Sequence, residues 1–230
     1  MDKRILVAVP SCHALRHWEQ AVRETWGKDV PAEVDLRFFL GDRAGIHDSA
    51  LHPYAADEVH LSVPDDWAGI TKKTVAIFRW ALSQGYTYVW KADLDTLVRP
   101  MLLLSSGLDQ YDWVGGQNSH FASGGAGYGL SRRAMECVVN WPITQTCAED
   151  LHTAEALLSS GIQLHHDPRF KFIPGASLEP EDVTYHLSSV RAWDAKYTPA
   201  WMYEAWNAKG TYCPLREPKV ENKRWLRRLR

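Results

Sequence analysis

The sequence predicts an α/β sandwich with a mostly parallel central sheet, and two observations carry that prediction. Short apolar, β-prone runs recur along the first half of the chain, and segments whose apolar residues have helical spacing lie between them. Strands separated by helical patterns of about ten to fifteen residues are typical of parallel sheets covered by helices. With 230 residues, 45% of them hydrophobic, the chain can form one ordinary globular domain with a full core.

The first elements follow from apolar runs and their spacing. The runs that we expect to be strands are 5–9, 36–40, 59–61, 86–91 and 113–115. Helical spacing of apolar residues occurs in 18–26 and in 75–82.

Later elements follow from residues that start and stop helices. Pro100 precedes a predicted helix over 101–104, at a position where proline is tolerated. A helix is also predicted over 149–160, with Gly161 as its stop. After Pro168, frequent prolines predict a region of loops.

Two aspartates follow the strand predicted at 86–91. Residues i and i+2 of an extended backbone project to the same side, so Asp93 and Asp95 can face one ion while Leu94 points into apolar packing. Mg²⁺ and Mn²⁺ prefer oxygen ligands and often keep positions open for substrate phosphates. The pair therefore predicts a cation site shared with a nucleoside diphosphate, with a turn or capping pair as the alternative.

Charge is distributed unevenly along the chain. Residues 219–230 hold six Lys or Arg and one Glu, while the whole chain has a formal net charge of −2, so the remainder is acidic. The acidic body lacks the bulk basic character of a nucleic-acid groove, whereas the tail has it. Trp225, Leu226 and Leu229 could share the apolar face of a helix lying on an anionic membrane, and a solvated terminus is the alternative.

The sequence offers neither a disulfide framework nor a membrane span. Free buried thiols are expected because the cysteines lie far apart without metal-type spacing, at Cys12, Cys137, Cys147 and Cys213. The apolar run 5–9 is too short for a signal peptide, and no run of roughly eighteen uncharged apolar residues occurs. We expect a cytoplasmic protein, with peripheral membrane attachment through the tail as an option, or an excised domain.

Six short segments form an ordered series along the chain. They are RETW at 23–26, FFLG at 38–41, ITKKT at 70–74 followed by Trp80, KADLDTLV at 91–98, ASGGAGYGLS at 122–131, and EDL at 149–151 followed by Gly161-Ile162. In this order they resemble the motifs of the β-1,3-galactosyltransferase and Fringe family, the inverting glycosyltransferases numbered thirty-one. The resemblance covers about positions 4 to 190 and implies the GT-A fold.

The chain departs from that family in three ways. Leu94 replaces the middle aspartate of the family's triple, which leaves the outer two aspartates in place. Ala154 and Ala156 stand where the family has a glycine and a cysteine, so a disulfide common in the family cannot form there, which favours a cytoplasmic enzyme. Beyond about residue 190 the resemblance ends, so it says little about the acceptor.

The resemblance implies a metal site of two carboxylates and one histidine. Asp93 and Asp95 supply the carboxylates. His186, at the end of a short β-prone run, is the expected third ligand, and His165 and His166 are its competitors.

The resemblance also implies a general base. Asp150 would take the proton of the acceptor hydroxyl, with Glu149 beside it as a second candidate. The alternative is that both are acids placed at a helix N-terminus, where the helix dipole stabilises them.

Donor recognition, by the same resemblance, falls to the end of the first strand and to two charged side chains. The residues are Pro10, Ser11, Arg23 and Asp57.

Two lysines and a glycine-rich segment complete the expected donor site. Lys73 and Lys91 could add positive charge against the leaving phosphate, or be ordinary surface lysines. Gly124, Gly125 and Gly127 would let the backbone approach the sugar or the acceptor closely, or be turn glycines before a helix that starts near Arg132.

These residues predict an inverting, metal-dependent transferase that moves a hexose from a UDP-sugar to an acceptor hydroxyl, with Mn²⁺ or Mg²⁺ as cofactor. The expected acceptor is a surface glycan or a lipid-linked saccharide. A hydroxymethylated DNA base, which the basic tail and the aromatic region 193–206 would suit, is an alternative, and an inactive sugar-nucleotide or glycan-binding module is another. We expect a catalytic domain over 1–218, with a donor half of about 1–115 and an acceptor half of about 116–218, and a basic tail at 219–230.

Overall fold

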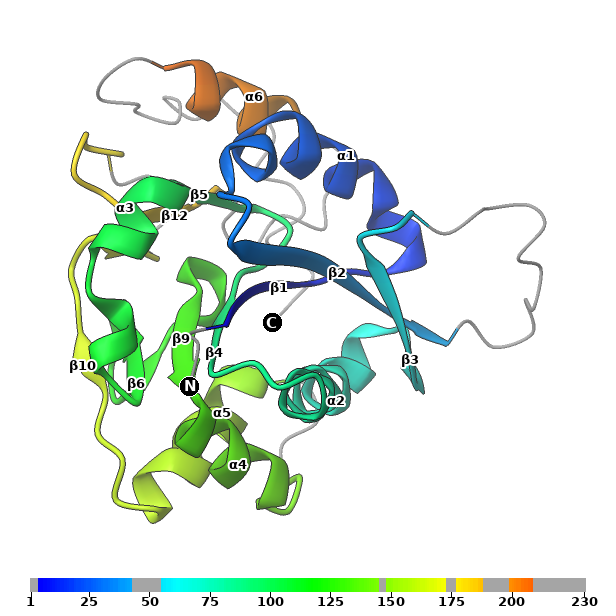
Figure 1. Ribbon diagram of the computed structural model, residues 1–230, viewed down its shortest axis with the longest axis vertical. Helices are drawn as coiled ribbons and strands as arrows, with labels where there is room; N and C mark the ends of the chain where they lie inside the picture. Colours follow the sequence, from blue (N-terminus) through cyan, green and yellow to red (C-terminus); the bar gives the residue numbers. More distant parts are fainter. Residues whose placement is uncertain (1–3, 43–54, 145–147, 173–176, 188–198, 209–230) are drawn as a thin grey trace, which may run out of the picture.

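The computed structural model describes residues 4–42, 55–144, 148–172, 177–187 and 199–208, which fold into helices around a central sheet (Figure 1). The strands are β1 (Ile5–Pro10), β2 (Val34–Asp42), β3 (Glu58–Pro64), β4 (Tyr88–Lys91), β5 (Thr96–Val98), β6 (Trp113–Gly115), β7 (Gln117–Asn118), β8 (Phe121–Ala122), β9 (Tyr128–Ser131), β10 (His165–His166), β11 (Phe170–Lys171) and β12 (Thr184–His186). The α-helices are α1 (Arg16–Glu24), α2 (Ile70–Ser83), α3 (Pro100–Ser105), α4 (Arg132–Asn140), α5 (Glu149–Ser159) and α6 (Ala200–Asn207). Short 3₁₀ helices are η1 (His13–Leu15), η2 (Trp26–Asp29), η3 (Trp67–Gly69), η4 (Leu108–Gln110) and η5 (Gly124–Ala126).

The central sheet of the described residues has seven strands in the order β10-β6-β9-β4-β1-β2-β3. β1 is parallel to β2 and β4, β2 to β3, and β10 to β6, whereas β9 runs antiparallel to β4 and β6. A second sheet, β11-β12-β5, and the β7-β8 hairpin complete the architecture. Since β1 and β4 are parallel neighbours, their carboxyl ends meet at one edge of the sheet, where ligands of such folds bind.

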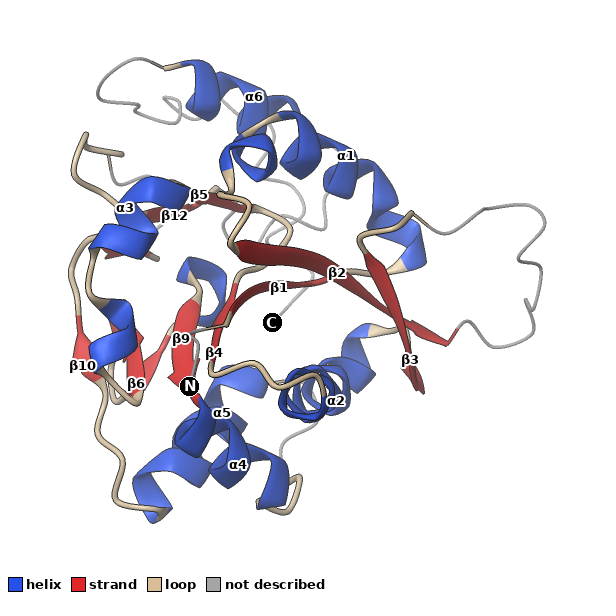
Figure 2. Cartoon of the chain, in the orientation of Figure 1, coloured by secondary structure: helices blue, strands red, loops and turns tan. Residues whose placement is uncertain are grey.

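Helices cover both faces of the central sheet (Figure 2). α1, α3 and α6 contribute to a core on one face, and α2, α4 and α5 to a core on the other. In β1, Ile5, Val7 and Val9 point into the first core, while Leu6 and Ala8 point into the second. Burial on both faces explains why this strand is a continuous apolar run rather than an alternating one.

Identifiable residues set the helix ends. The Thr25 hydroxyl donates to the carbonyl oxygen of Ala21 at 2.6 Å, and α1 stops one residue earlier. The Ser131 Oγ accepts from the Ala134 amide at 3.2 Å and caps α4. Gly161 follows α5 with φ of +74°, a backbone conformation that other residues adopt only with strain.

The structure confirms the predicted α/β fold, and each of the five predicted strands has its counterpart in β1, β2, β3, β4 or β6. The predicted helices correspond to α1, α2, α3 and α5, and the helix expected to start near Arg132 is α4. The prediction of loops after Pro168 is wrong in part, because β11, β12 and α6 lie there. α6 forms because Met202 and Ala205, three residues apart, bury one face of the helix against the first core.

The expectations about cysteines, membrane spans and the tail can be compared with the structure only within the described residues. Cys12 and Cys137 are free and half-buried, while Cys147 and Cys213 lie outside the described residues. No helix within the described ranges is long and apolar enough to cross a membrane. The basic tail lies outside these ranges, and the division into donor and acceptor halves stays a prediction.

Candidate active site

The Asp93–Asp95 pair lies where β4 ends, but not on an extended strand as the sequence pattern suggested. Residues 92–95 form a turn between β4 and β5, closed by the Thr96 amide donating to the Asp93 carbonyl at 3.0 Å. The Asp93 amide in turn donates to the Thr96 Oγ1 at 3.1 Å. Leu94 is buried in the apolar core, as predicted. Burial, and to a lesser extent the charge of Asp95, raise the pKa of Asp93 against the opposing charge of Lys91, so the two carboxylates interact electrostatically at this turn.

His186 is the histidine that the fold brings to this turn. It lies on β12, which pairs with β5 so that His186 is opposite Thr96. Its Nε2 lies 3.4 Å from Asp95 Oδ2, and the next amide, of Leu187, donates to the Asp95 carbonyl at 2.9 Å. Burial by itself would lower the pKa of His186, but the Asp95 carboxylate outweighs it and raises that pKa.

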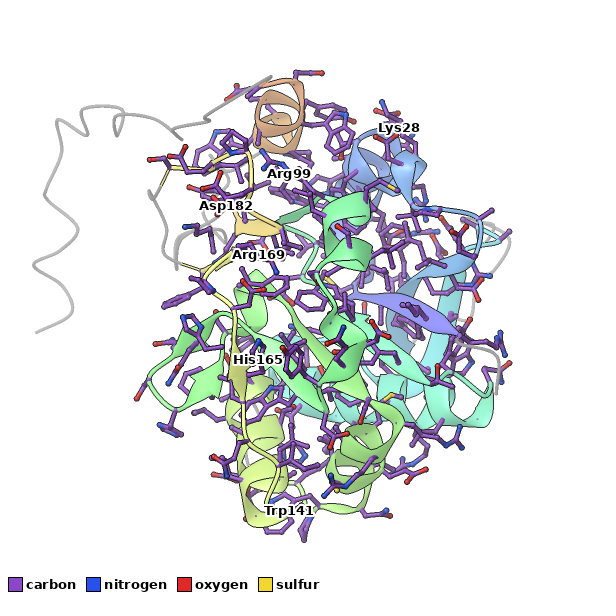
Figure 3. The ribbon with its side chains drawn as sticks, turned by 60° about the vertical axis from the view of Figure 1, so that its left-hand side comes forward. Lys28, Arg99, Trp141, His165, Arg169 and Asp182 are labelled. Atoms are coloured by element: carbon purple, nitrogen blue, oxygen red, sulfur yellow. The ribbon has the colours of Figure 1, made fainter. Side chains whose placement is uncertain are left out.

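The competing histidines lie elsewhere. His165 and His166 form β10, the edge strand that is three strands away from β4 in the sheet order. The ring of His165 stacks on Tyr111 with 3.5 Å between centroids, and His166 Nδ1 accepts from the Gln117 amide at 3.1 Å. Figure 3 shows His165 on this edge segment, apart from Asp182 and Arg169 further along the same stretch of chain.

Lys91 is buried, with an exposure of 1%, so it is not a surface lysine. Its Nζ lies 2.5 Å from Asp93 Oδ1 and 2.6 Å from Glu149 Oε1, and donates to the Gly124 carbonyl at 3.3 Å. Burial would lower the pKa of Lys91, but the Asp93 and Glu149 carboxylates together raise it. The lysine therefore stays charged and joins the turn after β4 to the start of α5.

Glu149 and Asp150, the two candidate bases, have different surroundings. Glu149 is buried, and the Tyr128 hydroxyl donates to its Oε2 at 2.6 Å while Lys91 holds its Oε1. Asp150 is half-buried, and its carboxylate accepts from the amides of Gly124 at 3.3 Å and Leu151 at 2.9 Å. Burial, and next the charge of Glu149, raise the pKa of Asp150. Both lie in the first turn of α5, so the helix-terminus interpretation also describes them correctly.

The glycines after β8 leave room for protein side chains. A Cβ on Gly124 would overlap Glu149 Oε1, and one on Gly125 would lie 2.6 Å from His186 Nδ1. Gly127 has φ of +80° and lies against the end of β4. Glycine is therefore needed at 124 and 125 because the Glu149 and His186 side chains approach the backbone closely there, which the sequence motif did not reveal.

The predicted donor residues lie at or after the end of β1 and on or beside α1, and Glu19 links Ser11 to Arg23. Pro10 ends β1, and the next residue, Ser11, is buried with its hydroxyl bonded to Glu19 Oε1. Arg23 makes a two-point ion pair with Asp57, at 2.8 Å through Nε and 2.9 Å through Nη2. A cavity of about 390 Å³ opens here, lined by His13, Arg16, His17, Glu19, Arg23, Ala55 and Glu58.

Three charged residues of this cavity, Arg16, Glu19 and Glu58, were not singled out from the sequence. The Arg16 Nη2 lies 2.5 and 2.7 Å from the two Glu58 carboxylate oxygens. Glu19 and Arg23, four residues apart on α1, lie 3.2 Å apart, and that spacing was the one available signal.

Lys73 is also buried rather than on the surface, and it does not lie with the aspartate pair. Its Nζ donates to the Ser11 carbonyl and to Asp65 Oδ1, both at 2.6 Å. Asp65 also accepts from the amides of Gly41 at 2.7 Å and His13 at 2.8 Å. Lys73 and Asp65 together thus link the segments that follow β1 and β3 to the end of β2.

The two carboxylates at the turn are the oxygen donors that Mg²⁺ and Mn²⁺ prefer, and His186 adds an imidazole nitrogen beside them. In the described part of the chain, no three such side chains already form a group that could hold a metal ion. Nucleotide-linked sites of this kind use one or two carboxylates plus phosphate oxygens, so a site completed by its substrate fits the residues present.

The architecture belongs to the GT-A class of glycosyltransferase folds. It is similar to that of the mannosyltransferase PcManGT from Pyrobaculum calidifontis, solved in complex with GDP-Man and Mn²⁺, with a TM-score of 0.50 and 17% sequence identity. The match covers 73% of this chain and 55% of that chain, so the present chain spans about half the length of that protein.

The profile of the Galactosyltransferase family matches residues 18–141, more than half of the sequence, and the chain belongs to that family. A comparison with curated proteins found no match. The matched range includes the Asp93–Asp95 turn and Lys91 but ends before Asp150 and His186. The roles of these last two residues therefore depend on geometry.

Proposed function

We propose that the protein is an inverting, metal-dependent hexosyltransferase that uses a nucleotide sugar, preferably a UDP-sugar, as donor. Asp93, Asp95 and His186 would hold the cation together with the donor diphosphate. Asp150 is the general base. Pro10, Ser11, Arg23 and Asp57 bind the nucleoside part.

One observation carries this proposal: a single short segment, η5, contacts both His186, one of the proposed cation ligands, and Asp150, the proposed base. The Gly124 amide donates to Asp150 at 3.3 Å. The next residue, Gly125, accepts from Thr96 at 2.8 Å and lies against the His186 ring. Groups suited to a diphosphate and to an acceptor hydroxyl are thus held side by side, as a transfer between them requires.

The reaction is a single displacement at the anomeric carbon. The acceptor oxygen attacks that carbon while its proton passes to the Asp150 carboxylate, and the bond from carbon to the phosphate oxygen breaks with its electron pair staying on the phosphate. A bound divalent cation supplies the positive charge that stabilises the leaving diphosphate. The raised pKa of Asp150 makes it a stronger base than an exposed aspartate.

The donor half of the proposal uses the cavity beside α1. Its volume of about 390 Å³ and its ring of charged and imidazole side chains suit a nucleoside with several hydrogen-bonding groups. Arg23 lines this cavity and is braced by Asp57, so its guanidinium is held in place before a ligand arrives. Lys73 holds Asp65, which accepts from the amide of the lining residue His13, and Lys91 supports the diphosphate side through Asp93.

For the acceptor, we propose a surface glycan or a lipid-linked saccharide. The basic tail would hold the protein at an anionic membrane, where each nearby cation contributes about 1 kcal/mol. Deletion of residues 223–230 should then abolish sedimentation with anionic vesicles without changing transfer to a small soluble acceptor. A parallel titration with duplex DNA distinguishes membrane docking by the tail from binding to DNA. If the full-length and shortened proteins bind vesicles equally and bind DNA equally, the tail has neither role.

The central test is a thermal-shift panel of nucleotide sugars with and without Mn²⁺. We expect a UDP-sugar to raise the melting temperature only when Mn²⁺ is present, and Asp95→Ala to abolish that rise. Asp29→Ala, which removes an exposed carboxylate on η2, is the matched control and should respond as the unmodified protein does. Stabilisation that is identical in Asp95→Ala would refute the cation site. A larger response to a GDP-sugar would reassign the donor.

A further inference from the structure

Lys91, Glu149 and Tyr128 are buried and, together with the partly exposed Asp93, join the two halves of the proposed site; we call these four residues the inner cluster. Lys91, which is 1% exposed, lies between the carboxylates of Asp93 and Glu149 at 2.5 and 2.6 Å. Tyr128 donates to the remaining Glu149 oxygen at 2.6 Å. Both oxygens of Glu149 are therefore engaged by protein groups, and Glu149 is not placed to act as a base.

The charges of the inner cluster do not balance. One ammonium faces two carboxylates, so one negative charge is in excess. Buried charge without compensation is unfavourable. The Glu149 side chain is only 9% exposed, whereas that of Asp93 is 32% exposed and lies within electrostatic range of Asp95. The excess is thus best neutralised at the Asp93 end, where a cation can arrive from solvent.

We propose that Glu149 and Lys91 are positioning residues that set the affinity of Asp93 for a divalent cation, although neither touches the ion. Glu149 shares the Lys91 ammonium, so that the charge of Asp93 is only partly compensated inside the protein. Without Glu149, the full ammonium charge falls on Asp93 and competes with the ion. This inference rests on the proposed function, because it takes Asp93 as a cation ligand.

The test measures Mn²⁺ alone, through loss of the electron paramagnetic resonance signal of the free ion. Glu149→Gln keeps the size of the side chain but removes its charge, and it should weaken Mn²⁺ binding about tenfold, as outer-shell substitutions at metal sites do. Glu155→Gln makes the same change on the same helix, where Glu155 accepts from Thr144 at 2.8 Å, and should bind like the unmodified protein. Urea unfolding of each variant checks that it is folded.

A second variant separates electrostatic positioning from loss of structure. The double variant Glu149→Gln with Lys91→Met removes the Lys91 ammonium, which competes with the ion for Asp93. It also removes the Glu149 charge that drew this ammonium away from Asp93. Mn²⁺ affinity should then return to that of the unmodified protein or exceed it. A purely structural role predicts the opposite, a further loss in the double variant, and that result would overturn the inference.

The outcomes also separate this inference from the proposed function. If Asp95→Ala abolishes Mn²⁺ binding while Glu149→Gln and Glu155→Gln bind equally well, the cation site stands and the positioning role is wrong. If Asp95→Ala binds Mn²⁺ like the unmodified protein, the cation site itself is wrong, and the inference fails with it.

Discussion

Two ion clusters lie at the same edge of the sheet and differ in their access to water. The inner cluster has its single cation, Lys91, fully buried. The second, which we call the outer cluster, consists of Arg16, Glu19, Arg23 and Glu58, which line the cavity beside α1, and Asp57, which pairs with Arg23. Its carboxylates Glu19 and Glu58 are buried, but its two arginine side chains are 23% and 25% exposed.

This difference in exposure determines how well each cluster tolerates the loss of a charged partner. In the outer cluster, water and a second arginine can replace a lost partner, since Arg23 also lies 3.5 Å from the Glu58 carboxylate that Arg16 binds. In the inner cluster, nothing among the contacts of Lys91 can replace its charge. The inner cluster is therefore expected to keep one fixed geometry, whereas the outer cluster can rearrange its ion pairs.

The largest effect should come from removing the inner cation. Lys91→Met leaves the buried Glu149 carboxylate and that of Asp93 uncompensated, and we expect the free energy of unfolding to fall by about 3–5 kcal/mol. Arg16→Met is the matched change in the outer cluster and should cost about 1 kcal/mol, because its partner keeps a second cation and solvent is near. Urea unfolding measures both. Similar losses in the two variants would mean that the clusters do not differ as proposed.

The next effect is on catalysis alone. Asp150→Asn keeps the shape of the side chain but removes its basicity, so transfer should fall by roughly 10²- to 10⁴-fold while donor affinity is preserved. Initial rates and calorimetric donor titrations measure the two quantities. Glu155→Gln on the same helix should leave both near their original values. If Asp150→Asn retains transfer within a few-fold, its carboxylate only caps α5, and the base lies elsewhere.

A smaller effect distinguishes the histidines. His186→Ala removes the imidazole that lies 3.4 Å from Asp95, and Mn²⁺ affinity should fall about tenfold. His165→Ala removes a histidine that stacks on Tyr111 at the far edge of the sheet, and Mn²⁺ affinity should not change. Titration followed by the resonance of free Mn²⁺ compares them. A reversed ranking would move the metal site to β10.

The sequence predicted the fold better than it predicted the state of individual side chains. Continuous apolar runs and helical spacing depend on local residues and the nearest layer, so the five strands and the helices α1, α2, α3 and α5 could be placed in advance. β5 and β9 were missed, because pairing with partners distant in sequence, more than local propensity, makes them strands. α6 was missed because prolines on either side of it dominated the pattern.

The site was predicted in its residue types and only partly in its arrangement. Asp93 and Asp95 could be paired from their spacing, although they lie in a turn rather than on a strand. Lys73 and Lys91 are charged, and charge favours the surface, so nothing local indicated that each would be buried against carboxylates supplied by other segments. The outer cluster depends on Arg16 and Glu58, forty-two positions apart, which only the fold brings together.

The smallest effect concerns Glu19 of the outer cluster and the pH dependence of stability. Burial raises the pKa of Glu19 to about 7, even though the Ser11 hydroxyl opposes the shift, and the nearby Glu58 carboxylate adds to it. Because the folded-state pKa lies above the unfolded value, the folded state binds more protons in between. The contribution of this carboxyl is therefore most favourable below about pH 4.5 and declines until about pH 7. The pKa of Glu58 is lowered, so this carboxylate becomes protonated only at lower pH.

Urea unfolding at pH 5, 6 and 7 isolates Glu19 when the protein is compared with Glu19→Gln. His60 and His186 also titrate near this range, but their contributions are common to both proteins and cancel in the difference. The stability of the unmodified protein relative to Glu19→Gln should fall by about 1–2 kcal/mol from pH 5 to pH 7. A constant difference would show that Glu19 is ionised throughout, held by Arg23 and its solvent-facing guanidinium. The outer cluster would then hold three charged carboxylates, Glu19, Asp57 and Glu58, at once. The two clusters would then differ more in their tolerance of charge than the raised pKa of Glu19 implies.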